Sequence, residues 1–252
     1  MTRPGDGGAR APGSAARPEG RRDASPRLEP GTLYVVATPI GNLEDITLRA
    51  LRVLGDADAI VAEDSRRVRA LLSAHGIRAR GPVLALPAFD EARRVPALLE
   101  RLAAGEAIAF VTDAGTPAVS DPGAILVRAA RDTGSRVTPV PGPCAAVAAV
   151  SACGLAGGGF CFLGFLPRTP GKLARALESA LAGGRTVAFH ESAVRLARTL
   201  EIAAPVLGER EVVVARELTK IHETFHAGTA AELARAFRDS PPRGECTVLV
   251  AA

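Results

Sequence analysis

The sequence has few aromatic residues and few lysines. Its 252 residues include no Trp, one Tyr and eight Phe. Proteins that hold single-stranded nucleic acid on stacking platforms need exposed aromatic rings, so this composition disfavours a non-enzymatic RNA-binding module. Only Lys172 and Lys220 are lysines, against 29 arginines, which indicates a general compositional bias rather than an arginine-rich binding motif. A formal charge of +4 and a pI near 9.2 permit a polyanionic partner without requiring one.

Cysteine pairs, membrane spans and secretion signals are also missing. The four cysteines form no C-x-x-C pair, and a chain of this size does not need disulfides for stability. No apolar run reaches the ~18–20 residues of a membrane span. The N-terminus lacks the hydrophobic segment of a secretory signal. These features predict a cytoplasmic protein with reduced thiols and no membrane partner.

The first thirty residues have almost nothing to bury. Residues 1–30 consist mainly of Pro, Gly, Arg, Ala and Ser, with six arginines against four acidic residues. Such a segment cannot offset the entropy lost on ordering by burying apolar surface, so we expect a disordered tail. The tail is either inert or a weak, non-specific arm for RNA.

From Thr32 onwards, apolar runs alternate with amphipathic stretches, as is typical of an α/β fold. The predicted strands are 33–37, 59–62, 83–86, 107–112, 136–140, 160–166, 185–190, 211–216 and 247–251. The predicted helices are 47–54, 65–75, 91–104, 122–133, 172–182, 194–203 and 230–239. The early connections are short enough for parallel crossover units, whereas the later part has fewer crossovers and favours a mixed sheet.

A glycine cluster interrupts this alternation. Gly154, Gly157, Gly158 and Gly159 predict a hinge or loop. We therefore expect two α/β domains, an N-terminal one over 31–143 with a mostly parallel sheet and a C-terminal one over 144–252 with a mixed sheet.

Three loops that combine Pro and Gly follow predicted strands. They are residues 38–42 (TPIGN), 113–117 (DAGTP) and 139–145 (PVPGPCA). Ligands of open α/β sheets lie beyond the carboxyl ends of the strands. Glycine lets backbone approach a ligand closely, and proline fixes a loop before binding. A Pro-Gly pair can also form a simple tight turn, but three such loops at one sheet edge favour a binding cleft.

The motifs of polyphosphate sites are absent. The chain contains neither G-x-G-x-x-G nor G-x-x-x-x-G-K-[ST], so an ordinary dinucleotide or P-loop site is unsupported. A ligand with adenosine and an amino-acid tail, but without a polyphosphate, suits a cleft of this kind better.

Seven strings occur in order across residues 38–250. They are TPIGNLEDITLRAL, AEDSR, TDAGTPAVSDPG, PVPGPCAA, FLGFLP, RELTK and GECTVLV. Each alone is a weak signal, but the ordered set is specific and covers essentially everything after the tail. With these strings the chain resembles the bacterial 16S rRNA 2′-O-ribose methyltransferases of the tetrapyrrole methylase superfamily.

This resemblance implies a two-domain tetrapyrrole-methylase fold with S-adenosylmethionine in the cleft between the domains. It also implies a homodimer, and as substrate a cytidine in the decoding region of 16S rRNA in the small ribosomal subunit. The cofactor-binding residues that it implies are Pro39, Gly41, Asp113, Ala114, Gly115, Thr116, Pro117, Pro141, Gly142, Cys144 and Ala145, with Glu191 and Leu218 from the second domain.

Four charged residues are candidates for the chemistry. Methyl transfer to a hydroxyl requires in-line positioning and removal of the hydroxyl proton. Glu63 or Asp64 is a candidate base or an acceptor for the ribose, with Arg66 beside them; alternatively Asp64 caps the next helix and pairs with Arg66. Lys220, a rare lysine here, could bind a phosphate, act as a base with a lowered pKa, or simply be solvated. Further possible phosphate contacts are Arg66, Arg67, Arg69, Arg168 and Arg195.

The segment His222-Glu223-Thr224-Phe225-His226 matches the zinc-protease pattern H-E-x-x-H. That site requires a helix, whereas Ile221, Thr224 and Phe225 favour extended structure. No obvious third ligand follows, so we expect no metal.

The resemblance has two gaps. The family has a His-Asn-Glu string where this chain has Pro87-Ala88-Phe89-Asp90-Glu91, and only Glu91 fits. The family has Glu-Ser-Pro-His-Arg where this chain has Glu191-Ser192-Ala193-Val194-Arg195. No function of those histidines carries over. The main alternative keeps the fold and cofactor but acts on a tetrapyrrole precursor or a protein side chain.

Overall fold

A computed structural model describes residue 1, residues 27–155 and residues 158–252. Most of the predicted disordered tail, residues 2–26, lies outside this part. The ordered body begins a little before the predicted residue 31. Leu28 packs on the hydrophobic core that includes Tyr34 and Val36. The Glu29 backbone N–H donates to the Tyr34 hydroxyl at 2.9 Å. The Glu29 carboxylate also pairs with Arg136, so burial and charge together hold these residues.

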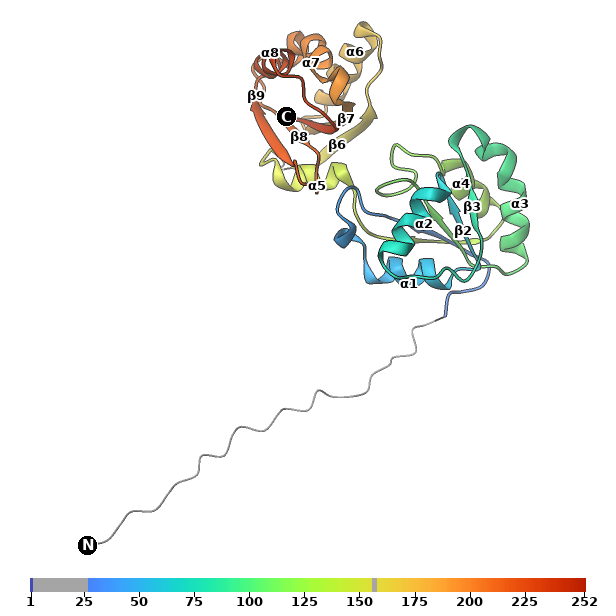
Figure 1. The fold of residues 1–252 in the computed structure, drawn as a ribbon. Coiled ribbons are helices and arrows are strands. Elements are labelled where there is room, and N and C mark those ends of the chain that lie inside the picture. The colour runs from blue at the N-terminus through green and yellow to red at the C-terminus, as the bar shows by residue number, and fades with distance from the viewer. Residues whose placement is uncertain (2–26, 156–157) are drawn as a thin grey trace.

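The first half contains a five-stranded parallel sheet of order β3-β2-β4-β1-β5 (Figure 1). Its strands are β1 (Thr32–Val36), β2 (Ala59–Ala62), β3 (Val83–Ala85), β4 (Ile108–Val111) and β5 (Arg136–Val140). All four strand pairs run parallel. Because β4, β1 and β5 are neighbours, the three Pro/Gly loops that follow them leave the same edge side by side.

Helices cover both faces of this sheet. On one face α1 (Leu48–Asp56) and α2 (Ser65–Ala74) bury Val53, Leu54, Leu71 and Leu72 against the strands. The other face is covered by α3 (Glu91–Ala103) and α4 (Ala124–Asp132). Two 3-10 turns, η1 (Leu43–Asp45) and η2 (Ala88–Asp90), precede α1 and α3. This three-layer arrangement is the doubly wound architecture that the alternating pattern predicts.

The second half contains a mixed sheet of order β6-β7-β10-β8-β9. Its strands are β6 (Phe160–Phe165), β7 (Thr186–Ser192), β8 (Val212–Arg216), β9 (Thr224–Gly228) and β10 (Glu245–Val250). Only β6 and β7 pair in parallel. One face is covered by α6 (Pro170–Leu181), α7 (Ala193–Leu207) and α8 (Ala230–Asp239). On the other face α5 (Ala145–Ala152) packs through Ala149, and Figure 1 shows it at the junction of the two halves.

The predicted α/β fold with one mostly parallel and one mixed sheet is confirmed. The helix α5 was not predicted, because seven of its eight residues are Ala or Val and give no helical period. Of the glycine cluster, Gly154, Gly158 and Gly159 lie between α5 and β6, while Gly157 lies outside the described residues. The expectation of extended structure in the H-E-x-x-H stretch is confirmed for Thr224, Phe225 and His226, which lie in β9 (Thr224–Gly228), whereas Ile221 and His222 form a turn.

Glu91, the one residue that fits the family string near position 90, has a structural role. Its side chain is buried, and its Oε1 accepts a hydrogen bond of 2.9 Å from the backbone N–H of Leu126 in the first turn of α4. An N-terminal helix N–H has no partner within its own helix, so this carboxylate ties the start of α3 to the start of α4.

Replacing Glu91 with Ala should lower the free energy of unfolding by about 2 kcal/mol, because it leaves a buried N–H unpaired. Glu91→Gln keeps a hydrogen-bond acceptor, so it should lower the free energy of unfolding by less. Urea denaturation followed by circular dichroism measures the change. Glu100→Ala, at an exposed position on the same helix, is the control; equal effects of the Glu91 and Glu100 substitutions would contradict the assigned role.

Candidate active site

The three Pro/Gly loops are joined to one another at the carboxyl edge of the parallel sheet. Thr38 and Gly115 form a backbone bridge, with Thr38 N–H to Gly115 O at 2.9 Å and Gly115 N–H to Thr38 O at 3.0 Å. The Thr116 hydroxyl donates to the Pro143 carbonyl at 3.0 Å. The loops therefore form one connected wall.

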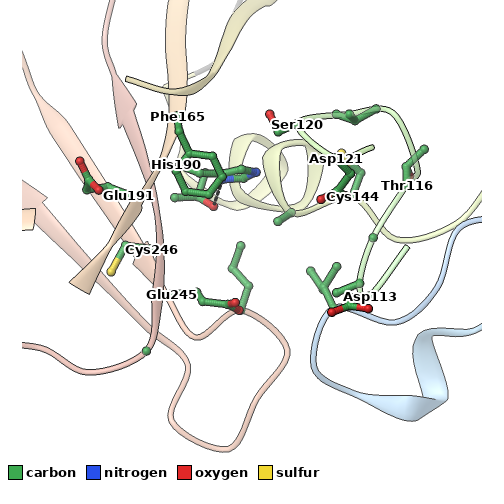
Figure 2. A pocket seen from close by; sticks show the side chains of 18 of the residues that line it. Asp113, Thr116, Ser120, Asp121, Cys144, Phe165, His190, Glu191, Glu245 and Cys246 are labelled. Carbon is green, nitrogen blue, oxygen red and sulfur yellow. Dashed lines mark hydrogen bonds between the residues drawn. The ribbon is translucent and has the colours of Figure 1, made fainter. Parts of the chain in front are cut away.

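This wall borders a cavity of about 480 Å³ that also contacts the second half of the chain (Figure 2). The size suits a small-molecule ligand. The lining residues from the first half are Ile40, Glu63, Arg67, Asp113, Ala114, Gly115, Thr116, Val119, Ser120 and Asp121. Cys144 and Ala145 follow at the start of α5, and the rest come from the second half: Phe165, His190, Glu191, Ser192, Ala215, Leu218, Lys220, Gly244, Glu245, Cys246 and Thr247.

Two contacts hold the halves together around the cavity. At the first, the Asn42 backbone N–H donates to the Thr219 hydroxyl at 3.0 Å, and a Cβ on Gly41 would lie 2.5 Å from Cγ of Lys220. At the second, a Cβ on Gly164 would lie 2.6 Å from Oγ of Ser120. Glycine at both positions leaves room for side chains of the opposing loop, and Gly164 also has a positive φ of 64°, which favours glycine.

Strained backbone gathers on the loops that border the cavity. Among the described residues, the non-glycine residues with positive φ are Ala118, Ser120, Glu217 and Thr219, at 64°, 64°, 52° and 65°. Conformations of this kind cost free energy and persist only where the surrounding structure imposes them, which is common at ligand sites.

Three carboxylates of the first half line the cavity. Glu63 follows β2, and Asp113 and Asp121 follow β4, the strand next to β2. Burial, with the neighbouring charge of Asp113, raises the pKa of Glu63. Burial, with the charge of Glu63, raises the pKa of Asp121 to about 6. Arg67 partly compensates this acidic group through its ion pair with Asp113 at 3.2 Å.

Of the two carboxylates left open by the sequence, Glu63 lines the cavity and Asp64 does not. The Asp64 side chain caps α2 by accepting from the Arg66 backbone N–H at 2.9 Å and pairs with the Arg66 guanidinium at 2.7 Å. Arg66 itself is exposed and does not line the cavity. This arrangement is the capping alternative considered above.

Lys220 lies at the cavity with its charge paired. Its Nζ donates to Glu217 Oε1 and Glu245 Oε2, both at 2.9 Å. Partial burial lowers the pKa of the ammonium, but the hydrogen bonds that it donates to Glu217 and Glu245 outweigh this effect, so the pKa is raised overall. The hypothesis of a base with a lowered pKa is therefore wrong: Lys220 stays positively charged at neutral pH.

The other predicted cofactor residues divide into two groups. Asp113, Ala114, Gly115, Thr116, Cys144, Ala145, Glu191 and Leu218 line the cavity, whereas Pro39, Gly41, Pro117, Pro141 and Gly142 lie in the supporting loops outside the lining. The Glu191 side chain points away from the cavity in Figure 2. It accepts from Ser192 N–H at 2.8 Å and from the Thr199 hydroxyl at 2.6 Å, and it pairs with Arg195 at 3.2 Å.

Several lining residues were not predicted from the sequence, among them Asp121, Phe165, His190 and Cys246. Asp121 belongs to the quoted string TDAGTPAVSDPG, so extending the loop by four residues would have included it. Phe165 likewise belongs to the quoted string FLGFLP, whereas no sequence signal marks His190. The place of both at the cavity depends on the pairing of β6 with β7. Burial raises the pKa of the Cys246 thiol to about 11, which makes it a poor nucleophile.

No group of three or more His, Cys, Asp or Glu side chains in residues 27–155 and 158–252 is arranged to hold a metal ion. In the same part of the chain, no helix combines the length and apolar character needed to cross a bilayer.

Residues 32–234 match the family of Tetrapyrrole (Corrin/Porphyrin) Methylases. The chain belongs to the tetrapyrrole methylase family. Membership makes it a methyltransferase with S-adenosylmethionine as the methyl donor, which confirms both predictions made from the sequence.

Among curated relatives of this methylase, Ribosomal RNA small subunit methyltransferase I of Escherichia coli O157:H7 is 48% identical over 223 residues, 87% of this chain and 77% of the relative. The protein of the same name from Thermotoga maritima is 42% identical over 220 residues, 87% of this chain and 98% of the relative.

Solved structures of other methylases share the fold. A cobalt precorrin-4 methyltransferase aligns with a TM-score of 0.67 at 22% identity, covering 88% of this chain and 95% of the other. The uroporphyrin-III C-methyl transferase of Thermus thermophilus, complexed with S-adenyl homocysteine, aligns with a TM-score of 0.59 at 20% identity, covering 87% and 96%.

The lining residues of this methylase fit S-adenosylmethionine. The donor carries a positively charged sulfur and a positively charged amine, and Glu63, Asp113 and Asp121 supply the complementary negative charge. Apolar side chains such as Ile40 and Leu218 suit the adenosyl group. The helix α5 begins at Cys144 without a side-chain cap, so backbone N–H groups of its first turn remain available to an anionic group.

Asp121→Asn should raise the melting temperature of the ligand-free methylase at pH 8 by roughly 2–4 °C. The raised pKa of Asp121 means that its stabilising contribution is complete below about pH 4 and is lost as the pH rises through about 6. At pH 8 the wild type carries a partly buried charge that costs about 1 kcal/mol after allowance for solvent screening, and the amide avoids this cost.

Thermal melts at pH 4 and pH 8 measure this difference, which should vanish at the lower pH. Asp132→Asn, at an exposed position on α4, is the control and should change little. A lower melting temperature for Asp121→Asn at pH 8 would contradict the raised pKa.

Proposed function

We propose that this methylase transfers a methyl group from S-adenosylmethionine to the 2′-hydroxyl of a cytidine ribose in the decoding region of 16S rRNA. The observation that carries the rRNA substrate is the 42–48% identity to Ribosomal RNA small subunit methyltransferase I over about 87% of the chain. The solved structures of methyltransferases named for tetrapyrrole substrates are only 20–22% identical to this chain, so they support the fold alone.

The protein's task follows from the chemistry of the donor. When bound, S-adenosylmethionine supplies a methyl group activated by its positively charged sulfur, and transfer of this group to a hydroxyl releases a proton. Ala114, Gly115 and Thr116, with Cys144 and Ala145, would hold the donor. The bridge between Thr38 and Gly115 keeps these loops in place before binding, which lowers the entropy cost of positioning.

Glu63 and Asp121 are the proposed acceptors of the hydroxyl proton. Both line the cavity, and burial raises the pKa of each, so each binds a proton more readily than an exposed carboxylate does. The positive charge of the donor lowers both values again, which leaves the carboxylates ionised at neutral pH. Lys220, positively charged at neutral pH, is the proposed contact for a phosphate beside the target.

The proposal includes the small ribosomal subunit as partner, a homodimer and a cytoplasmic location. The homodimer accords with the resemblance, and light scattering on the purified protein measures it directly. The 2′-hydroxyl distinguishes RNA from DNA, so DNA should not be a substrate.

The substrate is tested by incubating the protein and labelled donor with 30S subunits, free 16S rRNA and uroporphyrinogen in parallel. We expect incorporation into ribosomal RNA only, at a site that becomes resistant to alkaline cleavage because its 2′-oxygen is blocked. Incorporation into uroporphyrinogen instead would favour the tetrapyrrole alternative, and label in a base rather than a ribose would refute the ribose assignment.

The proton acceptors are tested by single-turnover rates at saturating RNA and donor. Glu63→Gln or Asp121→Asn should lower the rate roughly 100-fold or more if that group accepts the proton. Asp64→Asn, next to Glu63 but outside the cavity, is the matched control and should retain most of the rate. The wild-type rate should be level above about pH 7 and fall as the pH drops through the apparent pKa of the carboxylates, at or below about 6. A rate that rises on acidification would exclude carboxylates as acceptors.

A further inference from the structure

Three rings pack together in a chain that has few aromatic residues, and two of them, Phe165 and His190, line the cavity. Phe162 and Phe165 lie on β6, and His190 lies beside them on β7. The His190 ring is 4.9 Å from that of Phe162 in an edge-to-face arrangement and 5.6 Å from that of Phe165 at a tilt of 59°. Figure 2 shows Phe165 and His190 together, across the cavity from Asp121 and Cys144.

His190 is held through one ring nitrogen, and the other is free. Its Nδ1 is hydrogen-bonded to the buried Thr247 hydroxyl at 3.1 Å. Within residues 27–155 and 158–252, Nε2 has no hydrogen-bond partner, and the imidazole points into the cavity in Figure 2. Burial lowers the pKa of His190, although Glu245 acts against this, so the ring is neutral at pH 7. It is therefore an oriented, uncharged hydrogen-bonding group.

Phe165 is 60% exposed although it is a large apolar residue. Its position is fixed from both sides. The neighbouring Gly164 sits against Ser120 of the first half, and the Phe165 ring rests on His190. An exposed aromatic ring held rigidly at the rim of a cavity is suited to stacking on a flat ligand.

The two walls of the cavity therefore suit different ligands. The wall with Glu63, Asp113 and Asp121 attracts a cation and repels phosphate. The wall with Phe165 and His190 offers a ring face and a hydrogen-bonding nitrogen, and its charged side chains Lys220 and Glu245 are paired with each other at 2.9 Å. A nucleobase is flat, uncharged and has hydrogen-bonding edges, and enzymes that modify RNA commonly hold a splayed-out base on aromatic side chains.

We propose that Phe165 and His190 form the binding site for the base of the target nucleotide. The Phe165 ring would stack on the base, and His190 Nε2 would hydrogen-bond to its edge. This inference rests on the proposed function, because it takes RNA as the substrate. It assigns base recognition to residues of the second half, opposite the acidic wall that faces the donor.

The kinetic test measures kcat and KM for 30S subunits with the full-length protein. Phe165→Leu should raise KM about tenfold through loss of stacking. Phe165→Trp keeps an aromatic ring and should have a KM near that of the wild type. His190→Phe keeps the ring packing but removes the nitrogens, and should raise KM about 5–10-fold. The affinity for S-adenosylmethionine, measured by calorimetry, should stay within about twofold in all three variants.

Matched controls are available outside the cavity. Phe89 is 91% exposed on η2, so Phe89→Leu tests whether any exposed phenylalanine matters. His226 packs edge-to-face on Phe237 and is hydrogen-bonded to Thr224, so His226→Phe repeats the histidine change at a site away from the cavity. Both controls should keep wild-type kinetics.

A second readout does not depend on catalysis. The chain contains no Trp, so Phe165→Trp creates a single fluorescent reporter at the proposed base-binding site. Stacking of a base on it should quench its fluorescence when protein-free 16S rRNA is added, by clearly more than in Phe89→Trp, which corrects for absorption by the RNA.

The possible outcomes distinguish failure of this inference from failure of the proposed function. If the wild type methylates no RNA, the proposed function fails. A wild-type KM in Phe165→Leu and His190→Phe, or equal quenching of the two Trp reporters, would overturn the proposed base-binding site and leave the proposed function intact. A weakened affinity for S-adenosylmethionine with unchanged KM for RNA would assign the rings to the donor instead and would equally overturn it.

Discussion

The site depends on the pairing of β4, β1 and β5 as neighbours in a parallel sheet. Parallel strands end at a common edge and lie ~4.8 Å apart, so three loops that are far apart in sequence emerge within reach of one another. The backbone bridge between Thr38 and Gly115 and the hydrogen bond from Thr116 to Pro143 then join them. With any other order of these strands, no residue of the loops could occupy its present place.

Much of this edge could be predicted from the sequence, because it depends on local pattern. Strands 59–62 and 136–140 and the helix 230–239 match the observed elements residue for residue. Apolar alternation and Pro/Gly chemistry are local properties, so they identify elements and loops without knowledge of the fold. The structure adds the strand order, and with it the fact that the three loops are adjacent.

The rest of the site could not be predicted, for three physical reasons. The helix α5 is almost uniformly apolar, so its sequence has no period to detect. His190 and Phe165 face the cavity only because β6 pairs with β7, a long-range contact. The choice between Glu63 and Asp64 depends on which side chain turns toward Asp113, and neighbouring residues of the same type give no sequence signal for this.

The acidic wall also has a consequence for the end of each turnover. In the proposed arrangement, loss of the methyl group would leave the donor's sulfur uncharged, so its attraction to Glu63, Asp113 and Asp121 would weaken. The carboxylates would thus favour binding of S-adenosylmethionine over S-adenosylhomocysteine, which would ease release of the product.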